Sequence, residues 1–132
     1  MGELNPGDAI GELRVTPDKY LPHRYAGASG DFNPIHIDVE FAKAVGLPQN
    51  ILHGLYSMGI VARGCVEAAG GDPRALKRLR VQFRGMGVPE QEIAVTGTVT
   101  EVGNGRATAE VEAAQGDNRI IRNAEAELEL ER

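Results

Sequence analysis

The chain has 132 residues, of which 42% are hydrophobic and 25% are charged, so it is long enough for one packed core and too apolar for a disordered tail. Its formal net charge of −5 argues against general nucleic-acid binding. The longest apolar stretch, residues 54–62, is too short to span a membrane, and residues 1–6 lack the features of a signal peptide. Cys65 is the only cysteine, which excludes an internal disulfide and a cysteine zinc site. We therefore expect one cytoplasmic domain over residues 1–132, with neither nucleic acid nor a membrane as a partner.

The first elements predicted in the chain are a short strand and a helix that contains proline. Glu12 to Val15 alternates polar and apolar residues, which indicates a strand. Thr16 and Pro17 are typical of a helix N-cap followed by proline at the first helical position. Because Pro22 interrupts this segment, we expect a helix in two pieces that reaches to about Ala28.

Two further helices are predicted, of very different character. Glycines and an Asn-Pro pair predict a loop over residues 27–34, and residues 39–45 then indicate a short helix that ends at Gly46. Residues 53–69 are long enough for a helix of several turns, with Arg63 as the only charge in most of its length. A helix that is apolar on nearly all sides must be enclosed by the rest of the protein.

Strands joined by tight turns are predicted for the second half of the chain. Residues 78–84 alternate strictly, which places Leu79, Val81 and Phe83 on one face. Further strands are expected at residues 92–102, at 106–114 and from the turn at 116–118 to about residue 130, with a hairpin turn at 103–105. In the last strand, the residues expected to face inward are Ala124, Ala126, Leu128 and Leu130.

One apolar helix followed by strands linked through hairpins is typical of an α+β protein in which an antiparallel sheet wraps round the helix. This architecture is the hot-dog fold, and the early strand would complete its sheet. Such a sheet has exposed edges and one open side, so we expect the domain to pair with a second copy.

Residues 25–36 carry the groups suited to chemistry. Asp31 and His36 are of the right kind for proton transfer, and Asn33 between them is an uncharged donor and acceptor. Pro34 keeps Asn33 out of the α region, so Asp31 and His36 cannot lie on one regular helix, and the bend can bring them together. Spacing alone also fits a glycine-rich turn in which Asp31 caps a helix and His36 lies at the surface.

The start of the apolar helix adds a second feature. Residues 51–55 lead directly into this helix, whose free N–H groups and positive dipole end can hold a developing negative oxygen. Gly54 has no side chain to obstruct an approaching carbonyl group. An acid/base pair beside such a site is the minimum for addition or elimination next to a carbonyl.

The run YAGASGDFNPIH at residues 25–36, followed by FAKAVGLP at 41–48 and HGL at 53–55, resembles the MaoC-like dehydratase family. This family includes (R)-specific enoyl-CoA hydratases and (3R)-hydroxyacyl-ACP dehydratase subunits, and the resemblance covers nearly the whole chain. It implies a single MaoC-like hot-dog domain, normally a dimer.

The resemblance also implies roles for named residues. Asp31 and His36 would be the catalytic pair of a hydro-lyase that adds water reversibly to a trans-2-enoyl thioester. His36 is expected to act as the base towards water and Asp31 to pass a proton to the α-carbon. Asn33 and Gly54 would bind substrate, with the Gly54 N–H on the thioester oxygen. No metal or other cofactor is expected, since CoA or phosphopantetheine is part of the substrate.

Two alternatives stay open. A hot-dog acyl-CoA thioesterase shares the fold but does not need the Asp-x-Asn-Pro-x-His spacing. A non-catalytic subunit of a heterodimeric dehydratase would not need the intact Asp31 and His36. The expected partner is a second copy of the chain, and the alternative is a heterodimer with a second hot-dog subunit.

Other ionisable residues are interpreted more simply. His53 is expected to be structural, fixing the loop at the helix start, and His23 to lie at the surface. A metal site built from His36, Asp38 and a third group is conceivable only on residue type, because nothing fixes the third ligand. The basic strip, which comprises Arg74, Lys77, Arg78, Arg80 and Arg84, fits a solvated strand face slightly better than a contact with CoA phosphates or an acyl carrier protein.

Overall fold

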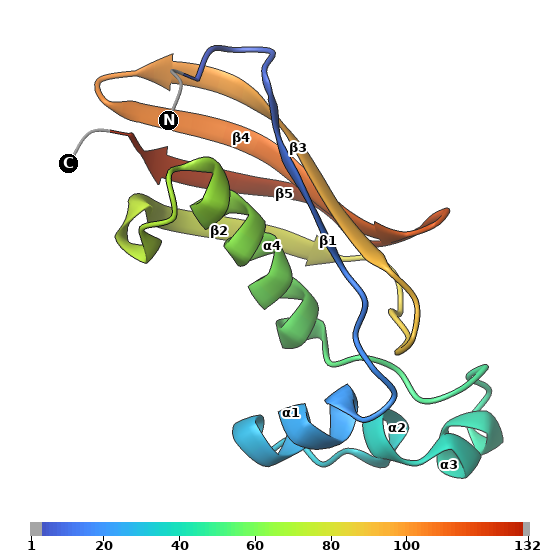
Figure 1. Cartoon of the computed structure of the whole chain (residues 1–132). Coiled ribbons are helices and arrows are strands. Elements are labelled where there is room, and N and C mark those ends of the chain that lie inside the picture. Colours follow the sequence, from blue (N-terminus) through green and yellow to red (C-terminus); the bar gives the residue numbers. More distant parts are fainter. Residues whose placement is uncertain (1–3, 131–132) are drawn as a thin grey trace.

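The computed structural model describes residues 4–130 and shows a curved five-stranded sheet around one long helix (Figure 1). Residues 1–3, on which the expectation about a signal peptide partly rests, lie outside this range. In chain order the elements are β1 (Ala9–Val15), α1 (Leu21–Ser29), α2 (Pro34–Ile37), α3 (Val39–Ala44), α4 (Gly54–Ala68), the 3-10 turn η1 (Pro73–Ala75), β2 (Leu76–Phe83), β3 (Ile93–Gly103), β4 (Arg106–Gln115) and β5 (Asn118–Glu129).

The sheet has the strand order β1-β3-β4-β5-β2 and every neighbouring pair is antiparallel. Asn104 and Gly105 make the β3–β4 turn at positive φ, as a tight hairpin requires, and Gly116 does so between β4 and β5. Both predicted hairpins are therefore confirmed. An antiparallel sheet wrapped on one long helix is the hot-dog fold, so the predicted fold class is also confirmed.

The core lies between α4 and the concave face of the sheet. The buried residues of α4 are Ser57, Val61, Gly64 and Cys65, which recur at helical spacing and form one stripe. From β5, Ala124, Ala126 and Leu128 face this stripe, as expected. The opposite side of α4 is more open, since Leu55 is 65% exposed. Within this chain, therefore, the sheet covers only one side of α4.

Three local predictions differ from the structure. The helix expected from Thr16 begins only at Leu21, and Pro22 lies in its first turn, where a missing N–H breaks no hydrogen bond. Pro34, expected in a loop, opens the short helix α2. Phe83, expected to face the core, is 51% exposed. Its ring lies beyond the buried stripe, against Gly54 at the start of α4.

The three short helices gather at the N-terminal end of α4, away from the sheet (Figure 1). This arrangement places the segment between α1 and α3 beside the start of α4. Within residues 4–130, no helix combines the length and the apolar composition that a membrane crossing needs.

The Gly97→Ala substitution tests the packing of the sheet. A Cβ at Gly97 would lie 2.6 Å from Val111 Cγ1 and 2.9 Å from the Glu110 carbonyl oxygen, so we expect a loss of about 1–3 kcal/mol of unfolding free energy. Urea unfolding measures this loss. The control is Gly59→Ala in α4, where a Cβ meets nothing within 4 Å and the helix should gain about 1 kcal/mol. A Gly97→Ala protein as stable as the parent would contradict the packing.

Cys65 provides a second test, of the core around α4. Burial raises the pKa of its thiol to about 11, so at pH 8 the thiol is neutral as well as inaccessible. A coloured disulfide reagent should therefore titrate no thiol in the native protein at pH 8 and one after unfolding in urea. Fast reaction of the native protein would show that the α4 stripe is open.

Candidate active site

The bend between α1 and α2 assembles the first part of the site. Asn33 has φ −53° and ψ 127°, outside the α region as Pro34 predicts, and its Oδ1 accepts a hydrogen bond from the Ile35 N–H at 3.2 Å. Asn33 therefore caps α2 with its side-chain oxygen. Asp31 Oδ1 in turn accepts from the Asn33 N–H at 3.2 Å. These local bonds hold the loop in the bent form that the sequence predicts.

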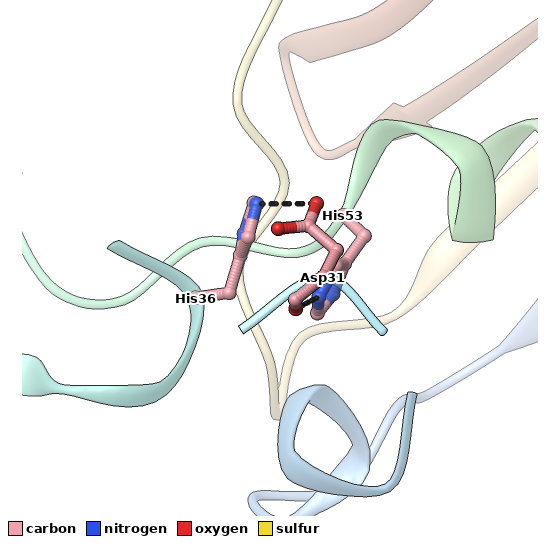
Figure 2. Close-up of side chains that lie close together, drawn as sticks. All are labelled: Asp31, His36 and His53. Atoms are coloured by element: carbon pink, nitrogen blue, oxygen red, sulfur yellow. Dashed lines mark hydrogen bonds and ion pairs between the residues drawn. The ribbon is translucent and has the colours of Figure 1, made fainter. Parts of the chain in front are cut away.

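The bend brings Asp31 and His36 together. Asp31 Oδ2 lies 3.7 Å from His36 Nε2, and the two side chains point toward each other in Figure 2. The imidazole is 11% exposed, whereas the carboxylate is 53% exposed. A separation of 3.7 Å is too long for a direct hydrogen bond but suits two groups bridged by one small polar molecule. The predicted pair is thus one geometric unit.

The orientation of His36 is set by its other nitrogen. His36 Nδ1 lies 2.8 Å from the Ile51 carbonyl oxygen, and because a carbonyl only accepts, Nδ1 carries the hydrogen. Asn50 Nδ2 also donates to the His36 carbonyl at 2.9 Å. In the neutral imidazole, Nε2 then presents its lone pair toward Asp31, which is the state that a general base needs.

His53 joins the pair, which sequence reasoning did not predict beyond a structural role at the helix start. Its Nε2 lies 3.0 Å from the Asp31 carbonyl oxygen, and its ring stacks on His36 with centroids 3.9 Å apart and planes at 20° (Figure 2). The residue is 3% exposed. The position of His53 directly before Gly54 indicated that it lies at the start of the helix. Because His53 is 22 residues from Asp31 in the sequence, no local pattern indicated the contact between them.

Gly54 is the first residue of α4, where backbone N–H groups have no partner within the helix. The His53 side chain is turned to Asp31 and makes no capping hydrogen bond to them. A Cβ at Gly54 would lie 3.2 Å from the Phe83 ring, so the missing side chain makes room for Phe83. The predicted open approach at Gly54 is therefore bounded on one side by an aromatic ring.

The cluster of Asp31, His36 and His53 also has the composition of a metal site, with one ligand atom from each within 4.8 Å of the others. His53 Nε2 carries the hydrogen that binds the Asp31 carbonyl, so the lone pair of this ring lies on the buried Nδ1. Asp38, considered as a ligand, accepts at Oδ1 from the Phe41 N–H at 3.1 Å and caps α3. Proton transfer needs only the Asp31–His36 pair, whereas a metal site would also need the lone pair of His53 Nδ1.

Three residues of the basic strip, Lys77, Arg78 and Arg80, lie on β2 and pair with glutamates of the neighbouring strand β5. Arg74 lies in η1 and pairs with Asp72, and Arg84 follows the end of β2. Arg78 lies 3.9 Å from Glu127, and Arg80 lies 3.8 Å from Glu125. The Arg84 guanidinium donates to Gln82 Oε1 at 2.7 and 3.1 Å. Exposed pairs of this kind add little stability, but they neutralise the strip and support its interpretation as a solvated strand face.

Comparison with known proteins identifies the family of this chain. The family model for the MaoC like domain matches residues 6–119. The fatty acid synthase beta subunit hexB of Dothistroma septosporum is 33% identical over 131 residues, which are 97% of this chain and 7% of that protein. Enoyl-CoA hydratase ChsH3 of Mycobacterium tuberculosis is 34% identical over 110 residues, which are 83% of this chain and 36% of that protein.

A solved structure gives the same result for the fold. The MaoC-like dehydratase from Phytophthora capsici superimposes with a TM-score of 0.80 at 28% identity, over 100% of this chain and 45% of that one. The chain thus spans less than two thirds of each of these proteins. Since the family model covers most of its length, the chain belongs to the MaoC-like domain family.

Proposed function

We propose that this chain adds water reversibly to the double bond of a trans-2-enoyl thioester and forms a (3R)-3-hydroxyacyl thioester. The observation that carries this proposal is the Asp31–His36 pair, whose facing atoms lie 3.7 Å apart beside the N-terminus of α4. The relative named an enoyl-CoA hydratase supports the substrate class.

Asp31 and His36 hold the reacting water between them. In the hydration direction, His36 Nε2 accepts a proton from the water while the water oxygen bonds to the β-carbon. The proton that His36 receives passes to the Asp31 carboxylate, and Asp31 delivers it to the α-carbon from the same side, which makes the addition syn. Both residues end the cycle in the forms in which they began it, so atoms and charge balance.

The thioester oxygen is held at the start of α4. It gains negative charge in the transition state, and the Gly54 N–H at the positive end of the helix dipole stabilises that charge. Loss of one such donor typically raises the barrier by about 2.7–4 kcal/mol. Asn33, which lies between Asp31 and His36 in the sequence, binds substrate through its side-chain Nδ2, since its Oδ1 caps α2. The CoA or phosphopantetheine belongs to the substrate, and the chemistry needs no resident cofactor.

The assembly we propose is a homodimer with the second copy over the open side of α4. Large apolar side chains near the start of α4 are exposed in the isolated chain, and such patches mark interaction sites. They are Phe32, Leu55, Phe83 and Met86. A heterodimer with a second hot-dog chain is the alternative, and light scattering with mass analysis of the purified protein distinguishes the two.

Crotonyl-CoA hydration tests the reaction and the pair. We expect the ultraviolet absorbance of the enoyl thioester to fall with the parent protein, with chiral analysis giving the (3R) alcohol. Asp31→Asn and His36→Ala should each lower kcat by about 10²–10⁴-fold because proton transfer is lost. The matched controls Asp38→Asn and His23→Gln change the same residue types outside the pair and should retain the parent kcat.

A native protein that hydrates neither crotonyl-CoA nor trans-2-octenoyl-CoA would contradict the proposal. Release of free thiol from acyl-CoA, abolished in Asp31→Asn, would identify a thioesterase instead. Activity that appears only after a second hot-dog chain is added would identify a subunit of a heterodimer.

The Gly54→Pro substitution tests the oxyanion donor. Proline removes the N–H and suits the first helical position, and His53, at φ −65° and ψ 135°, already has the backbone that a following proline favours. We expect kcat to fall about 10²–10³-fold relative to Gly54→Ala, which adds the same Cβ against Phe83 but keeps the N–H. Equal kcat values in the two variants would place the thioester oxygen elsewhere.

A further inference from the structure

His53 is a buried imidazole that takes no part in the proton transfers of the proposed reaction. We propose that His53 is a positioning residue that aligns both members of the catalytic pair, Asp31 through its backbone and His36 through its ring. The catalytic consequence rests on the proposed function, but the geometry does not. The same residue reaches both groups because it lies 3.0 Å from the Asp31 carbonyl oxygen and stacks on His36 at 3.9 Å.

The hydrogen bond from His53 ties the Asp31 loop to the body of the protein. Within the loop, Asp31 has only short-range bonds, from its N–H to Ser29 Oγ and from the Asn33 N–H to its carboxylate. The bond from His53 Nε2 comes from 22 residues away in the chain. It therefore sets where the exposed carboxylate stands relative to the start of α4.

His36 is held by the same segment that holds Asp31. Its Nδ1 donates to the Ile51 carbonyl at 2.8 Å, and Asn50 donates to its carbonyl at 2.9 Å. Residues 50–53 thus form one segment that makes hydrogen bonds to both His36 and Asp31, and His53 is its last residue. A shift of this segment would move Asp31 and His36 together, whereas loss of the His53 hydrogen bond would release Asp31 alone.

Stacking on His53 fixes the orientation of the His36 ring plane. The His53 ring lies nearly parallel to His36 on one side and is 4.7 Å from the Tyr25 ring, which itself contacts Tyr56. His36 rotates about its side-chain bonds only if this stack opens. The lone pair on Nε2 therefore stays directed at Asp31.

His53 Nδ1 shows that packing alone does not explain the residue. This nitrogen is buried and has no hydrogen-bond partner among residues 4–130. A proton there would be buried without an acceptor, so the fitting form is the neutral ring with its hydrogen on Nε2. A phenyl ring would fill the space without an unpaired nitrogen, and only the Nε2 donor toward Asp31 distinguishes histidine from it.

Two substitutions separate the donor from the ring. His53→Phe keeps a flat ring for stacking and removes the donor, while His53→Gln keeps a nitrogen donor the same number of bonds from Cβ and removes the ring. We expect His53→Phe to lower kcat on crotonyl-CoA by about 10²-fold with KM changed less than threefold, since misplacement of a reacting group costs about that much. His53→Gln should recover about tenfold of this loss, although its thermal midpoint is no higher than that of His53→Phe.

Nitrogen NMR of the parent protein supplies a readout that does not depend on turnover. Two-bond ¹H–¹⁵N spectra at pH 7 should show the hydrogen of His53 on Nε2 and that of His36 on Nδ1. If His53→Phe does not fold, the spectra and the His53→Gln kinetics decide the matter.

Several outcomes would overturn the inference. They are a His53→Phe kcat within twofold of the parent, a His53→Gln kcat no better than that of His53→Phe, or a hydrogen on His53 Nδ1. An inactive parent protein with the expected tautomers would instead reject the proposed reaction and leave the alignment by His53 standing.

Discussion

The packing of α4 against the concave face of the sheet is the constraint on which the rest of the molecule depends. Its buried stripe, from Ser57 to Cys65, approaches the sheet so closely that a Cβ at Gly64 would lie 3.1 Å from Val95 Cγ1. Because the stripe begins one turn inside the helix, the first turn of α4 projects beyond the core. The exposed N-terminal dipole end of α4 is thus a direct result of how the core is filled.

Two segments that lie beside this projecting first turn of α4 form the site. The loop that contains Asp31 bends because proline restricts the residue before it, and residues 50–53 run extended into the start of α4. Backbone carbonyls of both segments accept hydrogen bonds from histidine nitrogens, at Ile51 and at Asp31. Each imidazole therefore uses one nitrogen to hold its position, and in His36 the other nitrogen, Nε2, faces the Asp31 carboxylate.

The outer face of the sheet has a different role. Arginines of β2 stand opposite glutamates of β5, so the local concentration of positive charge is balanced by its neighbour strand. Exposed apolar surface gathers instead around the start of α4, where Phe83 and Leu55 lie beside polar groups. A face of this kind, apolar with a few directed polar atoms, is typical of a binding surface.

The sequence by itself determined the long helix α4, the strand pattern of the second half, the two hairpin turns and the bend at Asn33 and Pro34. Each of these depends on periodicity or on the φ range of a few adjacent residues, and so is encoded locally. Tertiary structure alone decided the place of His53, the exposure of Phe83 and the pairing of Arg78 and Arg80. These depend on which segments meet and in what register, and the register of β2 on β5 shifts between Arg80 and Gln82. Such shifts follow from packing across the whole sheet, which no local pattern contains.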